Sequence, residues 1–281
     1  MEYASIFAAL GVQVTIVDRA DRPLQFFDEE LVRTFVRSFE QEGGRYWGAQ
    51  TIKTVQWDGI SQAVTMLQDG QVITSDKMLV ALGRQANLED LNLGATGLTV
   101  TEKGTLAVNE HCQTAIPHIY GVGDLVGSGL ASSAMEQGRR AVCHALGLPE
   151  GQSAGPIPVG IYTIPEMSSI GLDETAARKR YRDVMVGRAR FHEIARGQIS
   201  GISNGLLKMV ADPTGEHLLG VQIVGEGATE LIHMGQMALQ HAASIDSFVE
   251  NIFNFPTLAE SYRVAALDIV GQRQRRLAAA A

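Results

Sequence analysis

The chain has 281 residues, with 45% apolar and 19% charged residues, and this composition excludes disordered, collagen-like and coiled-coil proteins. Acidic residues outnumber basic ones by 31 to 23, giving a net charge of −8. This balance argues against nucleic acid as the main partner, because phosphates bind basic surfaces. No apolar run reaches the roughly 18 residues of a membrane span, so we expect no membrane contact and a cytoplasmic location.

The N-terminus is typical of the second half of a βαβ unit. Met1–Leu10 predicts a helix already under way without an N-cap, and Gly11 ends it. Val12–Val17 is an apolar, β-branched run that predicts a buried parallel strand ending at Asp18, where an acid binds the ribose hydroxyls of a dinucleotide. The first strand and its glycine-rich turn would precede Met1, so the chain is expected to be a fragment.

The rest of the chain predicts a region of strands and helices, then a linker, and then an α+β domain. Residues 28–40 predict an amphipathic helix, and the turn Asp69-Gly70 predicts a hairpin. Gly147–Pro158 is the best linker candidate, because it is rich in Pro and Gly. Before it we expect strands at 51–57, 63–67, 71–74, 78–81 and 119–122 and a helix at 131–146. After it we expect strands at 184–189, 206–210 and 218–224 and helices at 228–241, 245–251 and 258 to about 276, which is an α+β domain.

Several short motifs resemble the flavoprotein disulfide reductase superfamily. Glu2–Ser5 is similar to the end of its NAD fingerprint, and Ile119–Asp124 to the strand and Gly-Asp of its second flavin motif. Thr163–Glu166 is similar to the start of its dimerisation domain. Each motif alone is weak, but their order and spacing are specific, and the resemblance covers essentially the whole chain.

This resemblance implies an α/β fold with three parts. Residues 1–84 would be a partial, doubly wound NAD(P)-binding domain without its first strand and glycine turn. Residues 85–150 would be the C-terminal end of an FAD-binding domain, and residues 156–281 an α+β dimerisation domain. A homodimer or a higher homo-oligomer is implied, with its final helical region packed against a symmetry mate.

Within the superfamily, Asn254–Leu267 resembles the soluble pyridine nucleotide transhydrogenase family, as do Ala195–Ile199 and Gly225–His233. Disulfide reductases carry a His-Pro pair at this point, with the His acting as general base towards a thiol. Here Phe255 stands in that position, and a phenyl ring accepts no proton. The resemblance therefore implies hydride transfer from NADPH to NAD⁺ through FAD, without a catalytic side chain from this segment.

Five residues are implied to bind FAD. Asp124, after Gly123, would bind a ribitol hydroxyl, or would serve only as a helix N-cap or turn residue. Leu130, Ala131 and Ser132 would begin a helix whose positive end stabilises reduced flavin, and Ser132 would cap that helix in the structural alternative.

Six residues are implied to bind NAD or NADP. Asp18 would bind the ribose, and Arg19 and Arg22 would bind a 2′-phosphate, or would be ordinary loop residues. Glu2 resembles the family acid near the nicotinamide. Gly83 would allow close approach of the cofactor, while Arg84 would bind it or be a surface charge; these six are Glu2, Asp18, Arg19, Arg22, Gly83 and Arg84.

Other polar residues receive structural interpretations. Thr257 and Glu260 form a capping-box pattern, which explains Glu260 without catalysis. The seven histidines show no ligand spacing, so no metal site is expected. Cys112 and Cys143 are expected to be reduced thiols.

Three hypotheses follow. The first is an FAD-dependent NAD(P) transhydrogenase of which this chain is the C-terminal part. On this hypothesis the chain alone binds FAD poorly. The second is a dihydrolipoamide dehydrogenase-like disulfide reductase, which requires an upstream cysteine pair. The third is a non-catalytic dimerisation module without cofactor.

Overall fold

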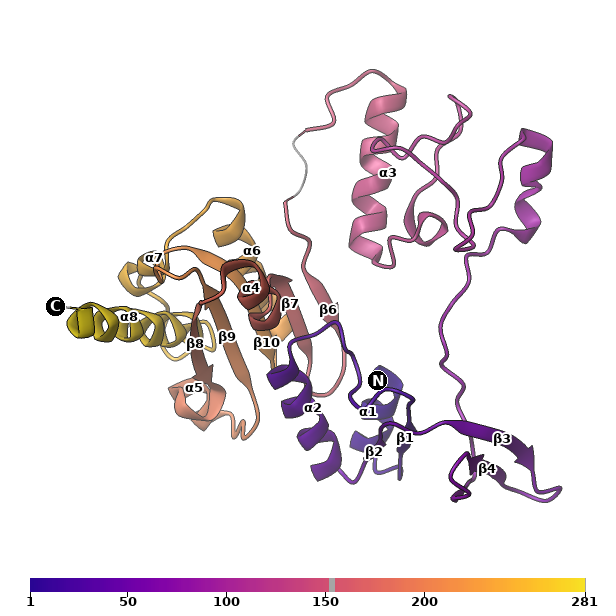
Figure 1. Ribbon diagram of the computed structural model, residues 1–281, viewed down its shortest axis with the longest axis horizontal. Coiled ribbons are helices and arrows are strands. Elements are labelled where there is room, and N and C mark those ends of the chain that lie inside the picture. The colour runs from indigo at the N-terminus through magenta and orange to yellow at the C-terminus, as the bar shows by residue number, and fades with distance from the viewer. Residues whose placement is uncertain (152–154, 281) are drawn as a thin grey trace. The chain divides into compact units, whose positions relative to one another are not determined.

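The computed structural model describes residues 1–151 and 155–280, and the chain divides into two compact units (Figure 1). Unit 1 combines Met1–Met78 with Gly155–Ala281, and unit 2 is Leu79–Ala154. Residues 152–154 of the predicted linker and residue 281 lie outside the described residues.

Unit 1 begins with the predicted half of a βαβ unit. Helix α1 (Glu2–Ala9) leads to strand β1 (Thr15–Val17), which pairs in parallel with β2 (Arg45–Trp47). Helix α2 (Glu29–Gln41) connects the two strands, and its N-cap Asp28 accepts a hydrogen bond from the Glu30 amide. A strand leading into Asp18 is therefore confirmed, although it is shorter than the apolar run.

A three-stranded antiparallel meander follows in unit 1. Its strands are β3 (Ile52–Trp57), β4 (Ala63–Leu67) and β5 (Val72–Ser75), in this spatial order. The predicted hairpin turn at Asp69-Gly70 is confirmed, because Gly70 has a positive φ of 90° and the Asp69 side chain accepts a hydrogen bond from the Gln71 amide.

The largest sheet of unit 1 has five antiparallel strands in the order β6-β7-β10-β9-β8. Its strands are β6 (Val159–Ile161), β7 (Met167–Gly171), β8 (Met185–Arg190), β9 (Leu206–Ala211) and β10 (Leu218–Val224). The helices of this region are α4 (Glu174–Tyr181), α5 (Ala195–Ile199), α6 (Ala228–Gln240), α7 (Ile245–Glu250) and α8 (Glu260–Ala280). Strands β6 and β7 were not predicted, because Gly160 interrupts the short apolar run of β6, and Ser168 and Ser169 interrupt that of β7.

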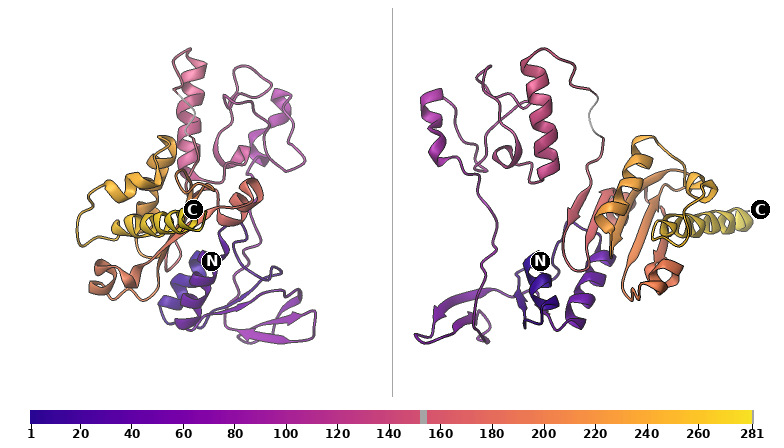
Figure 2. Two further views of the ribbon diagram at one scale, coloured as in Figure 1. Left: turned by 60° about the vertical axis from the view of Figure 1, so that its left-hand side comes forward. Right: turned by 180° about the vertical axis from the view of Figure 1, so that it is seen from behind.

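Every residue of β9 is buried, because helices cover both faces of the sheet (Figure 2). Leu207, Met209 and Ala211 pack in the core that contains Ile232 of α6 and Tyr262 of α8. The alternate positions face the other way, so Leu206 packs in the cluster of α2 and Val210 in that of α4. Helix α2 belongs to the N-terminal segment, but it therefore packs on the five-stranded sheet of the C-terminal domain.

Lys208, the remaining position of β9 on that face, is the centre of a buried ion cluster. The Lys208 side chain is 4% exposed, and its Nζ atom lies 2.8 Å from Asp28 Oδ2 and 2.8 Å from Glu174 Oε2. Glu30 Oε2 is 3.2 Å from the same Nζ and 2.9 Å from the guanidinium of Arg188, which neighbours Lys208 in the sheet. We call these five residues, Asp28, Glu30, Glu174, Arg188 and Lys208, the Lys208 ion cluster.

The carboxylates of this cluster lie at helix N-termini, where the helix dipole also favours negative charge. Asp28 caps α2, and Glu174 is the first residue of α4. Burial raises the pKa of Glu174, but hydrogen bonds from Lys208 and Arg178 outweigh this and lower it to about 2. Burial alone would lower the pKa of Lys208, yet its acidic partners raise it, so the ammonium stays charged.

Unit 2 has less regular structure than the sequence predicts. It contains helix α3 (Ala131–Ala145), which confirms that prediction, and 3-10 helices at Glu89–Leu91, Leu93–Thr96 and Gly123–Val126. The predicted strands at 78–81 and 119–122 are wrong: the first run, where unit 1 gives way to unit 2, forms no strand, and the second forms only an isolated bridge between Tyr120 and Gln113. An apolar run becomes a strand only where a neighbouring strand completes its hydrogen bonds.

Both cysteines lie in unit 2 as free thiols, as predicted; Cys112 is buried and Cys143 is partly exposed. Within residues 1–151 and 155–280, no helix is both long and apolar enough to cross a membrane.

Substituting Lys208→Met should destabilise the protein by about 3–5 kcal/mol, because three carboxylates would lose their buried cation. The free energy of unfolding in urea measures this cost. Lys179→Met, on the exposed side of α4, is the matched control and should stay within about 0.5 kcal/mol of wild type. A Lys208→Met protein as stable as this control would contradict the account.

Stability should also fall in acid through Glu174. Its pKa is about 2 in the folded protein against an ordinary 4.5, so the unfolded chain binds more protons between these values. The contribution of Glu174 is complete above pH 4.5 and is lost as the pH falls towards about 2. Urea midpoints measured across this range should depend less on pH in Glu174→Gln, and as strongly as wild type in the exposed control Glu250→Gln.

Candidate functional site

The predicted flavin-motif residues form a glycine-rich turn before α3. A Cβ atom on Gly121 would come within 3.0 Å of the Leu106 side chain, and Gly123 has a φ of 73°. The Gly123 amide donates a hydrogen bond to Gln137 Oε1 of α3 at 2.8 Å, which fixes the turn against that helix. Glycine is therefore needed at one position for space and at the other for backbone conformation.

This turn borders a pocket of about 850 Å³ within unit 2. Asp124 and Arg84, predicted for different cofactors, both line it. Asp124 is exposed, and its carboxylate accepts no hydrogen bond from the described residues. The other lining residues are Gln85, Ala86, Leu88, Glu89, Val100, Glu102, Lys103, Gly104, Thr105, Gly127 and Gly129.

Two polar features of this turn have no partner within the described part of the chain. The hydroxyl of Ser128, between the lining residues Gly127 and Gly129, is buried without a hydrogen bond. Helix α3 begins with N-cap Leu130, which offers no side-chain oxygen to the first amides of the helix. A polar ligand could form hydrogen bonds with both the Ser128 hydroxyl and the first amides of α3.

The N-cap alternatives for Ser132 and Asp124 are wrong, whereas the turn alternative for Asp124 agrees with its place in a 3-10 turn. Ser132 is the second residue of α3, so it cannot occupy the N-cap position, which Leu130 holds with an extended backbone. Asp124 lies inside the 3-10 helix Gly123–Val126, whose N-cap is Val122. Ala131 and Ser132 are exposed at the start of α3.

The strand-end acid and its arginines are in unit 1. Asp18 Oδ1 accepts a hydrogen bond from the Ala20 amide at 3.1 Å. Burial, together with Asp18 and Asp21, raises the pKa of neighbouring Tyr46 to about 12. Arg22 donates to the carbonyls of Phe27 at 3.0 Å and Gln25 at 3.3 Å.

The Arg22 guanidinium therefore stabilises its own loop through hydrogen bonds. Arg19 is exposed and has no polar partner in the described residues. The two predicted phosphate ligands thus differ: only Arg19 has its guanidinium available.

Glu2 is joined to the C-terminal domain within unit 1. Its Oε1 atom accepts a hydrogen bond from the Tyr162 amide at 2.8 Å. Ser5 Oγ accepts one from the Ile164 amide at 3.0 Å and donates to the Glu2 carbonyl. Helix α1 therefore holds the segment that begins the Thr163–Glu166 motif, and the Glu2 carboxylate is already engaged there.

Gly83 has a φ of 122°, and no atom lies within 4 Å of the place a Cβ would take. Its backbone conformation, not crowding, is what favours glycine there. Both Gly83 and Arg84 belong to unit 2.

Phe255 is 72% exposed and follows the partly buried Phe253. Next to it, the Thr257 amide donates to Glu260 Oε2 at 3.4 Å, which is one half of the predicted capping box. The other half, a hydrogen bond from the Glu260 amide to Thr257 Oγ1, is not among the contacts of the described residues, and Thr257 Oγ1 donates to the Asn254 carbonyl. Glu260 therefore has a local backbone role.

The three segments that resemble the transhydrogenases meet at a second pocket, of about 400 Å³, in unit 1. Arg196 comes from the first segment and Glu226, Gly227, Glu230 and Leu231 from the second; Pro256, Thr257 and Leu258 come from the third. Among the described residues, no histidine lines this pocket.

Spacing in the sequence could not reveal one further group of residues. His111, His144 and Glu150 converge in unit 2 although they are far apart along the chain.

Comparison with protein families gives two matches. Residues 1–138 match the family described as pyridine nucleotide-disulphide oxidoreductase, and residues 157–266 match the dimerisation domain of the same family. Together the two matches cover the first segment of unit 1, most of its second segment and most of unit 2.

Curated relatives and solved structures agree with these matches. A soluble pyridine nucleotide transhydrogenase of Mycobacterium bovis is 39% identical over 97% of this chain and 58% of its own length. One of Vibrio atlanticus is 40% identical over 95% of this chain and 58% of its own length. The chain thus spans less than two thirds of the curated relatives it matches.

Among solved structures, LpdA from Mycobacterium tuberculosis has a TM-score of 0.85 at 25% identity, over 98% of this chain and 59% of its own. The flavoprotein disulfide reductase RclA from Escherichia coli has a TM-score of 0.88 at 22% identity, over 94% of this chain and 61% of its own, and shows the fold alone. With its two family matches and relatives about 39% identical over nearly its whole length, this chain belongs to the pyridine nucleotide-disulphide oxidoreductase family.

Proposed function

We propose that this chain is part of a flavoprotein that transfers hydride between NADPH and NAD⁺. The observation that carries the proposal is Phe255: the position of the family base holds an exposed phenyl ring, and the nearby Glu260 is engaged with backbone. Hydride transfer between nucleotides requires no proton acceptor there, whereas reduction of a disulfide does. The names of the curated relatives support the same activity.

The pocket of unit 2 fits the ribityl and ring end of FAD. The unpaired Asp124 carboxylate suits a polyol hydroxyl, and the buried Ser128 hydroxyl lacks a partner in the described residues. The uncapped start of α3 offers amides and a positive dipole end to developing negative charge on a bound ring. FAD, when bound, would supply the group that accepts and returns hydride. Leu130, Ala131 and Ser132 would orient it.

Asp18 and Arg19 would serve the two nucleotides differently. The Asp18 carboxylate suits the ribose hydroxyls of NAD, and the available Arg19 guanidinium suits the 2′-phosphate of NADP. Glu2, Gly83 and Arg84 have weaker support as nucleotide ligands: Glu2 is bonded to Tyr162, and Arg84 lines the same pocket as Asp124.

The protein would act as a homodimer, since its C-terminal domain matches a family dimerisation domain. Large apolar side chains are exposed on this domain, including Ile252 at 95% and Tyr162 at 66%, and burial in a partner would remove them from water. A cytoplasmic location is part of the proposal, and the word soluble in the names of the curated relatives supports it.

The test is an assay of the protein as its gene encodes it, with FAD, NADPH and thionicotinamide adenine dinucleotide. Transhydrogenation is expected with little reduction of lipoamide. Phe255→Leu should lose far less than the about 10²–10⁴-fold that removal of a general acid–base costs. Brisk lipoamide reduction would favour a disulfide reductase, and a protein without flavin absorbance would favour a non-catalytic dimerisation module; either result would contradict the proposal.

Replacing Arg19 should separate the two nucleotides. In Arg19→Ala, KM for NADPH should rise about 10-fold or more, from loss of a charged hydrogen bond of about 1.5–3 kcal/mol, while KM for NADH stays unchanged. Arg22→Ala is the matched control, since its guanidinium is bound to the Phe27 and Gln25 carbonyls. An equal rise in KM for both nucleotides in Arg19→Ala would reject the assignment.

A further inference from the structure

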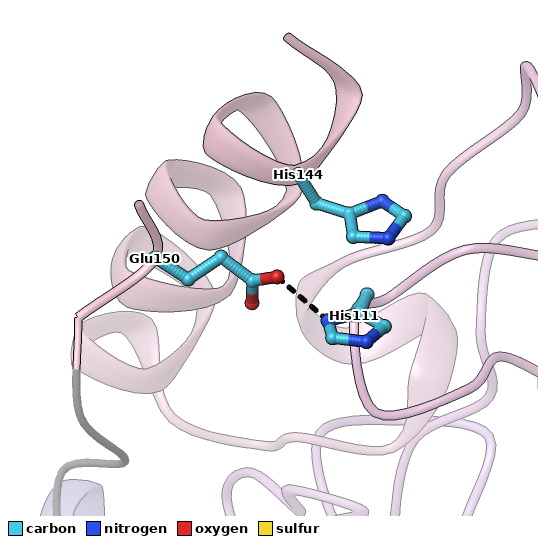
Figure 3. Close-up of side chains that lie close together, drawn as sticks. All are labelled: His111, His144 and Glu150. Carbon is cyan, nitrogen blue, oxygen red and sulfur yellow. Dashed lines mark ion pairs between the residues drawn. The ribbon is translucent and has the colours of Figure 1, made fainter. Parts of the chain in front are cut away.

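Two histidines and a glutamate form a cluster in unit 2 that the flavin and nucleotide sites do not use (Figure 3). His144 is in the last turn of α3, Glu150 follows that helix, and His111 comes from a separate loop. One ligand atom from each lies within 4.8 Å of the other two. None of the three lines the pocket that contains Asp124.

The contacts within the cluster leave one ligand atom, His111 Nδ1, close to a carboxylate but without a hydrogen bond. The imidazoles of His111 and His144 are stacked, with ring centroids 4.2 Å apart and an interplanar angle of 14°, so one ring must turn for both nitrogen lone pairs to meet at one ion. His111 Nδ1 lies 2.7 Å from Glu150 Oε1, yet this buried nitrogen makes no hydrogen bond of acceptable geometry. These two atoms, a ring nitrogen and a carboxylate oxygen, both carry lone pairs that can bind the same metal ion.

A second layer of hydrogen bonds orients the ligands. Tyr120 Oη lies 2.8 Å from His144 Nδ1 and also accepts from Gln113 Nε2 at 3.4 Å. We assign the His144 proton to Nδ1, donating to Tyr120 Oη, which leaves the Nε2 lone pair for a ligand. Glu150 uses its other oxygen, Oε2, to accept from Arg140 at 3.1 Å. Metal-binding histidines and carboxylates are held in this way by polar neighbours.

We propose that His111, His144 and Glu150 bind one divalent transition-metal ion, with zinc the best match. Two imidazole nitrogens and one carboxylate oxygen form a donor set that Zn²⁺ accepts, whereas Mg²⁺ and Ca²⁺ prefer oxygen alone. Three protein ligands leave a coordination position for water. The ion would tie the segment at Glu150 to the end of α3 and to the His111 loop.

The experiment measures Zn²⁺ affinity of the 281-residue chain by competition with a chromophoric chelator, and the visible absorbance of bound Co²⁺. One ion per chain is expected. His111→Ala, His144→Ala and Glu150→Gln should each weaken binding by about 100-fold or more, since loss of an outer neighbour alone costs 10–100-fold. His118→Ala, an exposed histidine of the same unit, is the matched control and should bind as wild type.

Wild-type affinity in His144→Ala, or equal loss in His118→Ala, would overturn the proposal. Cys112→Ser and Cys143→Ser should keep the ion, because the three converging ligand atoms come from His111, His144 and Glu150. Loss of binding in these variants would also overturn it. Circular dichroism checks the fold, and Glu150→Gln, which keeps an oxygen for Arg140, decides the outcome if a histidine variant does not fold.

Discussion

The placement of the N-terminal segment on the five-stranded sheet depends on the Lys208 ion cluster. A buried ammonium is unfavourable unless carboxylates surround it, and here two helix N-termini supply them. Asp28 begins α2 and Glu174 begins α4, so one side chain of β9 orients both helices on the same face. Apolar contacts from Leu31 and Phe35 of α2 then complete the packing.

This arrangement links the N-terminal segment of unit 1, which carries the proposed nucleotide ligands Glu2, Asp18 and Arg19, to the C-terminal domain. The loop that carries Asp18 and Arg19 leads directly into α2, and Glu2 of α1 binds the Tyr162 amide. Of the proposed nucleotide residues in unit 1, Glu2 is therefore held by the C-terminal domain, whereas the backbone of Asp18 pairs with Trp47 and Gln50 beside its own strand. The flavin residues of unit 2 depend on a different constraint: Gly121 fits closely against the Leu106 side chain, and Gly123 fits against α3.

Pattern reasoning from the sequence was reliable where local physics decides the structure. The β-branched run before Asp18, the Asp69-Gly70 hairpin and the amphipathic α2 formed as predicted. It failed where a partner decides: the run at 78–81 finds no neighbouring strand, and β7 forms although Ser168 and Ser169 interrupt its pattern, because β6 and β10 pair with it. The sequence was enough to identify the motif residues of the candidate site, but it did not reveal which residues they contact.

The sequence by itself determined the family, the order of the elements and the replacement of a base by Phe255, because each depends on which residues occur at which spacing. Only the tertiary structure decided that Arg22 is bound to its own loop while Arg19 is available, and that Arg84 and Asp124 share a pocket. It also brought His111 beside His144 and Glu150. Such contacts join residues distant in the chain, and packing alone, not local propensity, brings those residues together.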